Sequence, residues 1–426
     1  MRLETGTLGL RRVVITGMGT VNPLGNDVPS SWASLLKGTS GIARIEGLPL
    51  DGLPVQIAGQ LKGFDPGSVL DKKEVRRLDP FVHYAVAAAQ EAVNDAGIDL
   101  SLEVPERVGV AVGSGIGGLQ SLETNCRVFD TKGAARVSPF FIPQLTANMA
   151  AGYLSIRWGT LGPNICVATA CATGTHAIGE AYRLLQRGDA DVLLAGGTEA
   201  PITPLGLAGF AAMRALSTRN DAPASASRPF DAGRDGFVVA EGAGVLLLES
   251  LEHALRRRAR IQAEIVGYGM SADAYHMTAP AEDGRGARLA MQAALQDAGL
   301  EVSAVDYINA HGTSTPLNDV VETRAIRQLF AGHADRLMVS SSKSMTGHAL
   351  GAAGGLEAIF TALCLRDGRV PPTINYEEPD PDCDLDYVPN EGRSAQLKVA
   401  LSNSFGFGGT NAVLALARYP AEEEAS

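Results

Sequence analysis

The sequence repeats one pattern in its two halves. Residues 87–97 read AAAQEAVNDAG and residues 289–299 read LAMQAALQDAG, and each segment closes on the glycine that commonly ends a helix. Each is followed by a loop, a short apolar strand and a Gly-rich turn. Because duplicated units bury their apolar faces against each other, we expect an α/β fold of two similar halves, 1–258 and 259–426.

Each half also contains a predicted helix with small residues on one face. In the first half this helix starts at Cys171 and includes Gly174. In the second half it starts near His348 and includes Gly351 and Gly354. Small faces let helices approach closely, so we expect the two helices to pack at a pseudo-twofold axis. That packing would bring Cys171 and His348 near each other.

Three local features complete the expected fold. A single long helix is predicted over residues 73–96. The loop-rich insertion at 200–235 is long enough to cover a site, with residues 204–210 in a substrate wall. Asp319 and Glu322 lie at a predicted helix start, where they suit a capping pair.

Composition limits the classes of function. With 426 residues, 45% hydrophobic and 19% charged, the chain is expected to be a soluble globular protein with more than one core. A net charge of -11 argues against general binding to nucleic acids or membranes. Five cysteines without a CxxC pair, and no apolar leader or membrane-spanning stretch, predict a cytoplasmic protein, or one housed in an organelle after processing. A disulfide scaffold and a metal site are not expected.

Two Gly-rich turns are similar to cofactor loops only superficially. Gly17-Met18-Gly19 lacks the GxGxxG spacing of a dinucleotide site, and the glycines at 113–118 lack the GK[ST] ending of a phosphate loop. Close packing of the backbone is the preferred explanation for the second turn. No bound cofactor is therefore expected.

Cys171 lies where a predicted strand at 164–168 passes into a helix. The unpaired N–H groups of the first helical turn would face its sulfur, favour the thiolate and hold an oxyanion. This pattern predicts an exposed nucleophile on a sharp turn. The alternative for an isolated cysteine is a small buried hydrophobic residue.

Three further stretches favour the nucleophile. Residues 309–315 (NAHGTST) and 341–348 (SSKSMTGH) each carry a histidine, and residues 403–411 (NSFGFGGTN) are rich in glycine. Taken alone, each histidine would be interpreted as a hydrogen-bonded core residue. A cysteine and two distant histidines in Gly- and Ser/Thr-rich turns form a constellation that folding can assemble into a catalytic site.

Together these motifs resemble the condensing enzymes of the thiolase-like superfamily, specifically the beta-ketoacyl-acyl-carrier-protein synthases of type II. The resemblance covers residues 11–419 and keeps the order and spacing of the motifs. It implies a five-layered αβαβα fold from two homologous halves, a homodimer, and acyl carrier protein as partner. It also implies acyl transfer to the cysteine followed by decarboxylative condensation with malonyl-carrier protein, on substrates carried by phosphopantetheine and without a bound cofactor.

The resemblance also implies a role for each matching residue. The expected catalytic residues are the nucleophile Cys171, the paired histidines His311 and His348, and the supporting Lys343 and Glu357. Phe407 would gate the acyl tunnel and lend a backbone N–H. The substrate-binding residues would be Ile116 and Phe210 at the acyl chain, Thr278, Thr313 and Thr315 at the phosphopantetheine arm, and Phe405. The carrier-docking residues would be Lys72, Lys73, Arg76, Arg77, Arg136 and Arg214. A solvated helix face explains 72–77 equally well, and the single basic residue at 135–136 replaces the pair common in the family.

The chemistry explains why these residue types are needed. Attack of the Cys171 thiolate on a thioester creates an oxyanion, which backbone donors at Cys171 and Phe407 would stabilise by about 2.7–4 kcal/mol per donor. Loss of CO2 from the malonyl group leaves enolate charge, which two neutral imidazoles can hold. Lys343 is a cation in an apolar setting and should be paired, with Glu357 as the candidate.

Three alternatives belong to the same superfamily. A non-decarboxylating thiolase uses a second cysteine near the C-terminus, whereas this chain has none after Cys383. A silent chain-length partner of a polyketide synthase lacks the nucleophile, which is present here. A specialised polyketide ketosynthase with the same mechanism stays open, as does the preferred acyl length.

Overall fold

The computed structural model describes residues 9–420. The two ends of the predicted halves, 1–8 and 421–426, lie outside the described residues, as does most of the N-terminal stretch searched for a leader. The boundary at 258/259 stays a prediction. Within residues 9–420, every helix is too short or too polar to span a lipid bilayer.

Ten strands form one sheet in which the strand order is symmetric about the centre. The order is β10-β9-β13-β14-β8-β1-β7-β6-β4-β5, and each strand of the second half matches one of the first on either side of the β1–β8 pair. The first-half strands are β1 (Val13–Val21), β4 (Val108–Gly113), β5 (Asn164–Ile165), β6 (Val192–Glu199) and β7 (Gly242–Ser250). The second-half strands are β8 (Ala263–Ala272), β9 (Tyr307–Asn309), β10 (Met338–Ser340), β13 (Val399–Gly406) and β14 (Thr410–Ala417). The predicted duplication is confirmed.

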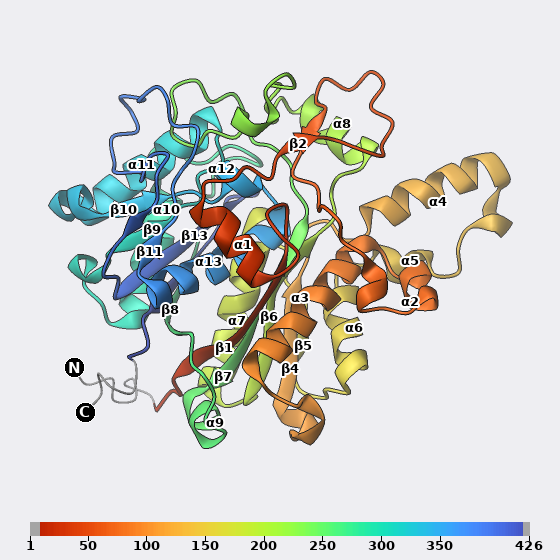
Figure 1. The fold of residues 1–426 in the computed structure, drawn as a ribbon, viewed down its shortest axis with the longest axis horizontal. Helices are drawn as coiled ribbons and strands as arrows, with labels where there is room; N and C mark the ends of the chain where they lie inside the picture. Colours follow the sequence, from red (N-terminus) through yellow and green to blue (C-terminus); the bar gives the residue numbers. More distant parts are fainter. Residues whose placement is uncertain (1–8, 421–426) are drawn as a thin grey trace.

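Helices cover the sheet in layers. The outer layer of the first half is α3 (Pro80–Ala96) against β1 and β7, and that of the second half is α10 (Arg285–Ala298) against β8 and β14. Between the two half-sheets lie α7 (Thr173–Arg187) and α13 (Ala353–Asp367), as Figure 1 shows. The remaining helices are α1 (Val28–Leu36), α2 (Lys72–Arg77), α4 (Leu119–Lys132), α5 (Phe141–Leu145), α6 (Met149–Trp158), α8 (Pro204–Ala212), α9 (Leu251–Arg256), α11 (Pro316–Phe330) and α12 (Lys343–Thr346). The four described strands outside this sheet, each of two residues, are β2 (Ala43–Arg44), β3 (Ile57–Ala58), β11 (Arg369–Val370) and β12 (Arg393–Ser394). This is the expected αβαβα order.

The repeated helices hold their strands through the same residue. On α3, Asp95 accepts the backbone N–H of Met18 at 3.0 Å, at the irregular part of β1. On α10, the matching Asp297 accepts the N–H of Tyr268 at 2.9 Å. The aspartate shared by the NDAG and QDAG endings therefore makes the same helix-to-strand hydrogen bond in both halves.

The small faces of α7 and α13 pack against each other as predicted. A Cβ atom built on Gly174 would lie 2.6 Å from the Gly355 nitrogen, and one on Gly354 would lie 2.4 Å from the Thr175 nitrogen. Both distances are shorter than real Cβ contacts. The close approach of the two helices thus requires glycine at both positions.

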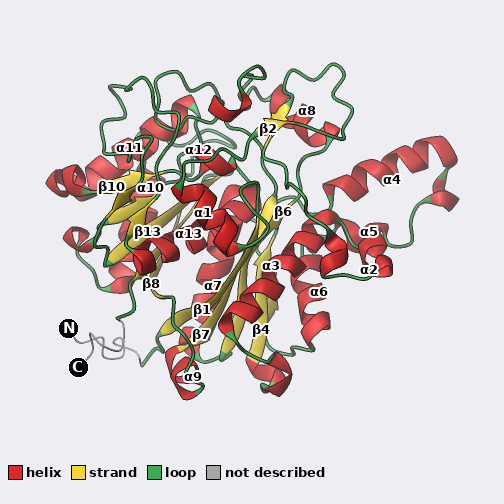
Figure 2. Cartoon of the chain, in the orientation of Figure 1, coloured by secondary structure: helices red, strands yellow, loops and turns green. Residues whose placement is uncertain are grey.

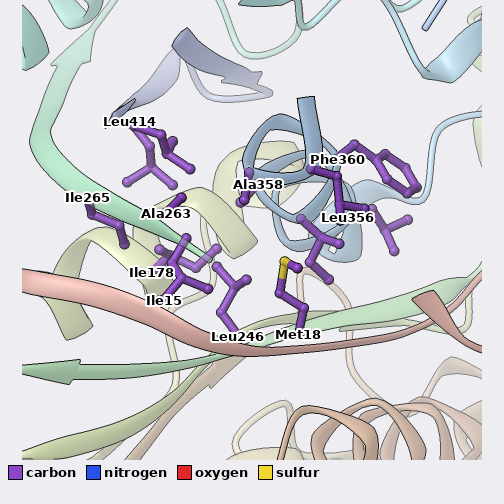
Figure 3. Close-up of a cluster of buried hydrophobic side chains, with 14 of the residues drawn as sticks. Ile15, Met18, Ile178, Leu246, Ala263, Ile265, Leu356, Ala358, Phe360 and Leu414 are labelled. Atoms are coloured by element: carbon purple, nitrogen blue, oxygen red, sulfur yellow. The ribbon is translucent and has the colours of Figure 1, made fainter. Parts of the chain in front are cut away.

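A dense apolar core surrounds these central helices. Side chains of α7 and α13 meet side chains from the strands of both halves, and each labelled residue in Figure 3 is 2% exposed or less. They are Ile15, Met18, Ile178, Leu246, Ala263, Ile265, Leu356, Ala358, Phe360 and Leu414. Full burial of each large aliphatic side chain contributes about 1.5–3 kcal/mol.

Two details of the predicted helices are wrong. The single helix over 73–96 is broken into α2 and α3, because Pro80 disfavours helical backbone at Asp79 and starts a new helix with Asp79 as its N-cap. The helix predicted from His348 starts at Ala353, after a 3-10 turn at Leu350–Ala352.

Candidate active site

A cavity of about 520 Å³ opens where the two halves meet. Figure 2 shows that the face of the molecule above the sheet, around α8, α11 and α12, consists mainly of loops. The predicted residues that line the cavity are Ile116, Cys171, Phe210, Arg214, Thr278, His311, Thr313, Thr315, His348, Phe405 and Phe407. Folding therefore brings the separate sequence motifs to one place.

Cys171 lies in a 3-10 turn, Ala170–Ala172, directly before α7. Only 5% of its surface is exposed, and the backbone N–H groups of Phe407 and of Cys171 itself point at its sulfur. Burial raises the pKa of the Cys171 thiol to about 11, against the N–H donors and the Lys343 cation. The expected exposure of Cys171 is therefore wrong; the backbone donors favour the thiolate as expected, but burial outweighs them.

His311 and His348 face each other in the cavity. Their ring centroids are 5.4 Å apart and the ring planes cross at 85°. Burial lowers the pKa of both imidazoles well below the usual value, and the nearby Lys343 cation lowers it further. Both rings are therefore neutral at physiological pH, as the chemistry requires.

Lys343 lies behind His311 rather than in the cavity. Its Nζ donates to the backbone oxygen of His311 at 2.7 Å and to the Glu357 carboxylate, and it lies 3.4 Å from His311 Nδ1. Burial raises the pKa of Glu357 to about 7, although the Lys343 cation opposes the shift. The expected pairing is present. Since an ammonium only donates, His311 Nδ1 accepts, and the ring proton sits on Nε2.

Glu322 holds the turn that carries His311. Its two carboxylate oxygens accept the N–H groups of His311 at 2.9 Å and Gly312 at 2.8 Å. The predicted capping pair is wrong: α11 starts at Pro316, and Asp319 accepts the N–H of Phe230 instead. Asp319 and Glu322 lie three residues apart on a helix and have apolar neighbours. That pattern was the sequence signal that both acids are buried and hold backbone N–H groups.

Glu199 is a second carboxylate that the sequence analysis missed. It ends β6, lines the cavity and is fully buried. Its oxygens accept the Ser114 hydroxyl and the N–H groups of Gly115, Ile116 and Gly351. An acid at the end of an apolar strand was the sequence signal for such a residue.

The loops on the open side of the cavity are tied to one another. Thr313 and Thr315 share a hydrogen bond between their hydroxyls at 2.9 Å, and the Ser314 between them has a left-handed φ of 68°. Gly408, next to Phe407, donates its N–H to the oxygen of Met277 at 2.7 Å, beside Thr278. The turn at Phe407 and the loop at Thr278 therefore meet directly.

Ile116 and Phe210 also line the cavity. Phe210 lies on α8, within the 200–235 insertion, and packs edge-on against Phe237 at 5.6 Å between ring centroids. The predicted placement of 204–210 at the cavity wall is confirmed for Phe210.

Most of the predicted carrier-docking residues lie away from the cavity. Lys72, Lys73, Arg76 and Arg77 are exposed on α2, and Arg136 is exposed after α4. Their role stays a prediction.

Comparisons with known proteins agree with this geometry. The models "Beta-ketoacyl synthase, N-terminal domain" and "Beta-ketoacyl synthase, C-terminal domain" match residues 10–254 and 262–377. The chain belongs to the beta-ketoacyl synthase family. A 3-oxoacyl-[acyl-carrier-protein] synthase 2 of Staphylococcus aureus (strain COL) is 54% identical over 411 residues, covering 96% of this chain and 99% of that protein.

Solved ketosynthases share the fold of this family member. A beta-ketoacyl synthase from Burkholderia phymatum STM815 has a TM-score of 0.90 and 38% identity, over 96% of this chain and all of that chain. A type II polyketide ketosynthase solved with its acyl-carrier protein has a TM-score of 0.90 and 37% identity, with the same coverage. The thiolase-like fold of this beta-ketoacyl synthase is thus shown over nearly the whole chain.

Proposed function

We propose that the protein is an acyltransferase of fatty-acid chain elongation. It condenses an enzyme-bound acyl thioester with malonyl-acyl carrier protein and yields 3-oxoacyl-acyl carrier protein and CO2. The observation that carries this proposal is the meeting of one buried cysteine, two backbone N–H donors and two neutral imidazoles in a single cavity.

In the first step, acyl carrier protein delivers an acyl chain to Cys171. The sulfur attacks the thioester carbonyl, and the N–H groups of Cys171 and Phe407 hold the oxyanion. The bond to the carrier sulfur then breaks, and the carrier thiol takes up the cysteine proton. Ile116 and Phe210 contact the acyl chain, and Phe407 turns aside to admit it.

In the second step, malonyl-carrier protein enters past Thr278, Thr313 and Thr315. The bond to the malonyl carboxylate breaks, CO2 leaves, and the electron pair forms an enolate held by the N–H groups of His311 and His348. The enolate carbon attacks the acyl carbonyl on Cys171. Product forms as the sulfur leaves as a thiolate, and Cys171 takes up one proton from solvent.

The alternatives are less favoured. A thiolase needs a second cysteine in the site. Among residues 9–420, Cys171 is the only cysteine that lines this cavity. A silent chain-length partner lacks the nucleophilic cysteine, whereas this chain has Cys171. A specialised polyketide ketosynthase would share the mechanism, but identity is 54% to a 3-oxoacyl-carrier-protein synthase 2 and 37% to a polyketide ketosynthase.

The proposed partners are acyl carrier protein and a second copy of this chain. Acidic carrier protein would dock on the basic residues of α2, Arg136 and Arg214, as a related ketosynthase was solved with its own carrier protein. A homodimer would cover β5, an edge strand of the sheet, and the exposed Ile156 on the adjacent α6. We also propose a cytoplasmic location and no bound cofactor.

The direct test is condensation by the purified protein. Incubation with a long acyl-carrier thioester and malonyl-carrier protein should yield the 3-oxoacyl-carrier product by mass spectrometry, and Cys171→Ser should yield none. Product from the Cys171→Ser variant, or none from the native protein, would contradict the proposal.

A further inference from the structure

The turn before α13 is the structural counterpart of the turn that carries Cys171. Ala170–Ala172 precedes α7 and Leu350–Ala352 precedes α13, each as one 3-10 turn. Both begin with a left-handed residue, at φ 49° for Ala170 and 47° for Leu350. Gly351, and not His348, therefore occupies the position of Cys171 in the second half.

The backbone N–H groups at these matching positions face different acceptors. The N–H of Cys171 points at the reactive sulfur. That of Gly351 donates to Glu199 Oε2 at 3.0 Å. Glu199 ends β6, and the matching strand β13 ends at Gly406, directly before the second N–H donor, Phe407. The Glu199 carboxylate therefore accepts the N–H of Gly351, just as an oxyanion would accept the matching N–H of Cys171.

Glu199 is well suited to hold two turns together. Its Oε2 also accepts the N–H of Gly115 at 2.8 Å, and its Oε1 accepts the Ser114 hydroxyl at 2.7 Å and the N–H of Ile116 at 3.1 Å. A buried carboxylate is stable only when such donors replace water. All four partners can donate, one from the second half and three from residues 114–116 of the first half, of which Gly115 and Ile116 line the cavity.

The turn that leaves His348 needs this anchor. The backbone of His348 is fixed on its upstream side, where its N–H donates to Val238 at 2.7 Å and its oxygen accepts from Ala240 at 2.9 Å. Downstream, the left-handed Leu350 is strained by about 1–3 kcal/mol, and such strain persists only where surrounding contacts enforce it. The bond from Gly351 to Glu199 is one such contact, beside the 2.9 Å hydrogen bond from the Ala352 N–H to the Ala349 oxygen that closes the turn.

We propose that Glu199 is a positioning residue that ties the His348 turn to the 114–116 turn of the first half, and so keeps the His348 imidazole in place for decarboxylation. This inference rests on the proposed condensing function. A cavity wall and a catalytic ring from opposite halves are joined through one side chain.

Two substitutions separate reach from charge. In a Cys171→Gln background, where CO2 release from malonyl-carrier protein reports on the histidines alone, Glu199→Asp keeps the charge but is one methylene too short to span both turns. Its kcat for CO2 release should fall about tenfold or more with KM unchanged, because small misplacements of catalytic groups are costly. Glu199→Gln keeps the reach, since its amide oxygen can accept from Gly115 and Gly351 while its NH2 donates to Ser114, and only the Ile116 N–H loses its acceptor. It should retain about a third or more of the parent kcat.

Glu91→Asp and Glu91→Gln are the matched controls. Glu91 is a half-buried carboxylate that accepts the N–H groups of Thr20 and Val28, away from the cavity. Both control variants should keep the parent kcat. A Glu199→Asp variant equal to the parent, or a Glu199→Gln variant as slow as Glu199→Asp, would overturn the positioning role. Absence of CO2 release from the Cys171→Gln parent itself would instead contradict the proposed function.

Discussion

Lys343 shows how a buried cation serves this site without touching substrate. It is 1% exposed and is held by the Glu357 carboxylate and the His311 backbone oxygen. Removing one partner of a buried ion pair leaves the other charge without compensation. Lys343 therefore contributes both to the neutral state of His311 and to stability.

Replacing Lys343 with methionine tests the stabilising role. At pH 8, above its raised pKa of about 7, Glu357 is an anion paired with Lys343; without that cation, which lowers the pKa, Glu357 must be buried either unpaired or protonated. The free energy of unfolding in guanidinium should fall by about 3–5 kcal/mol, and adding Glu357→Gln should restore part of it. A loss below about 1 kcal/mol would contradict the buried pair.

At the scale of single elements, the contact between α7 and α13 depends on glycine. A Cβ at Gly354 would lie 2.2 Å from Thr175 Oγ1 and 2.4 Å from its nitrogen, so Gly354→Ala should lower the free energy of unfolding by about 1–3 kcal/mol. Gly152 on α6 is the control, because a Cβ there meets nothing within 4 Å and Gly152→Ala should stabilise by about 0.4–1 kcal/mol. Equal effects in thermal unfolding would show that the helices do not pack this closely.

Some elements were readable from the sequence and others were not. The NDAG and QDAG repeats predicted the duplicated layers because Asp95 and Asp297 each accept a backbone N–H of the strand beneath their helix. The break at Asp79-Pro80 carried a local signal that the long helical pattern concealed. The burial of Cys171 had no local signal, because Phe237 and Leu350, which pack in the same apolar cluster, come from distant segments.

Across the whole molecule, stability should depend on pH through Glu91. Burial raises its pKa to about 7, so the folded state favours the neutral acid. Its contribution is fully present below about 4.5, the unfolded pKa, and is lost as pH rises through about 7, with a slope of at most about 1.4 kcal/mol per pH unit. Glu91→Gln should flatten the decline between pH 5 and 7 in denaturant unfolding. A native slope that is unchanged in this variant would contradict the assignment.

The two halves contribute different residues to the proposed reaction centre, Cys171 from the first and both histidines from the second. CO2 release from malonyl-carrier protein by the Cys171→Gln variant tests this division most directly, because it isolates the second half's chemistry. We expect release to continue in Cys171→Gln and to be lost when His311→Ala and His348→Ala are added. Unchanged release after both histidines are removed would contradict the account.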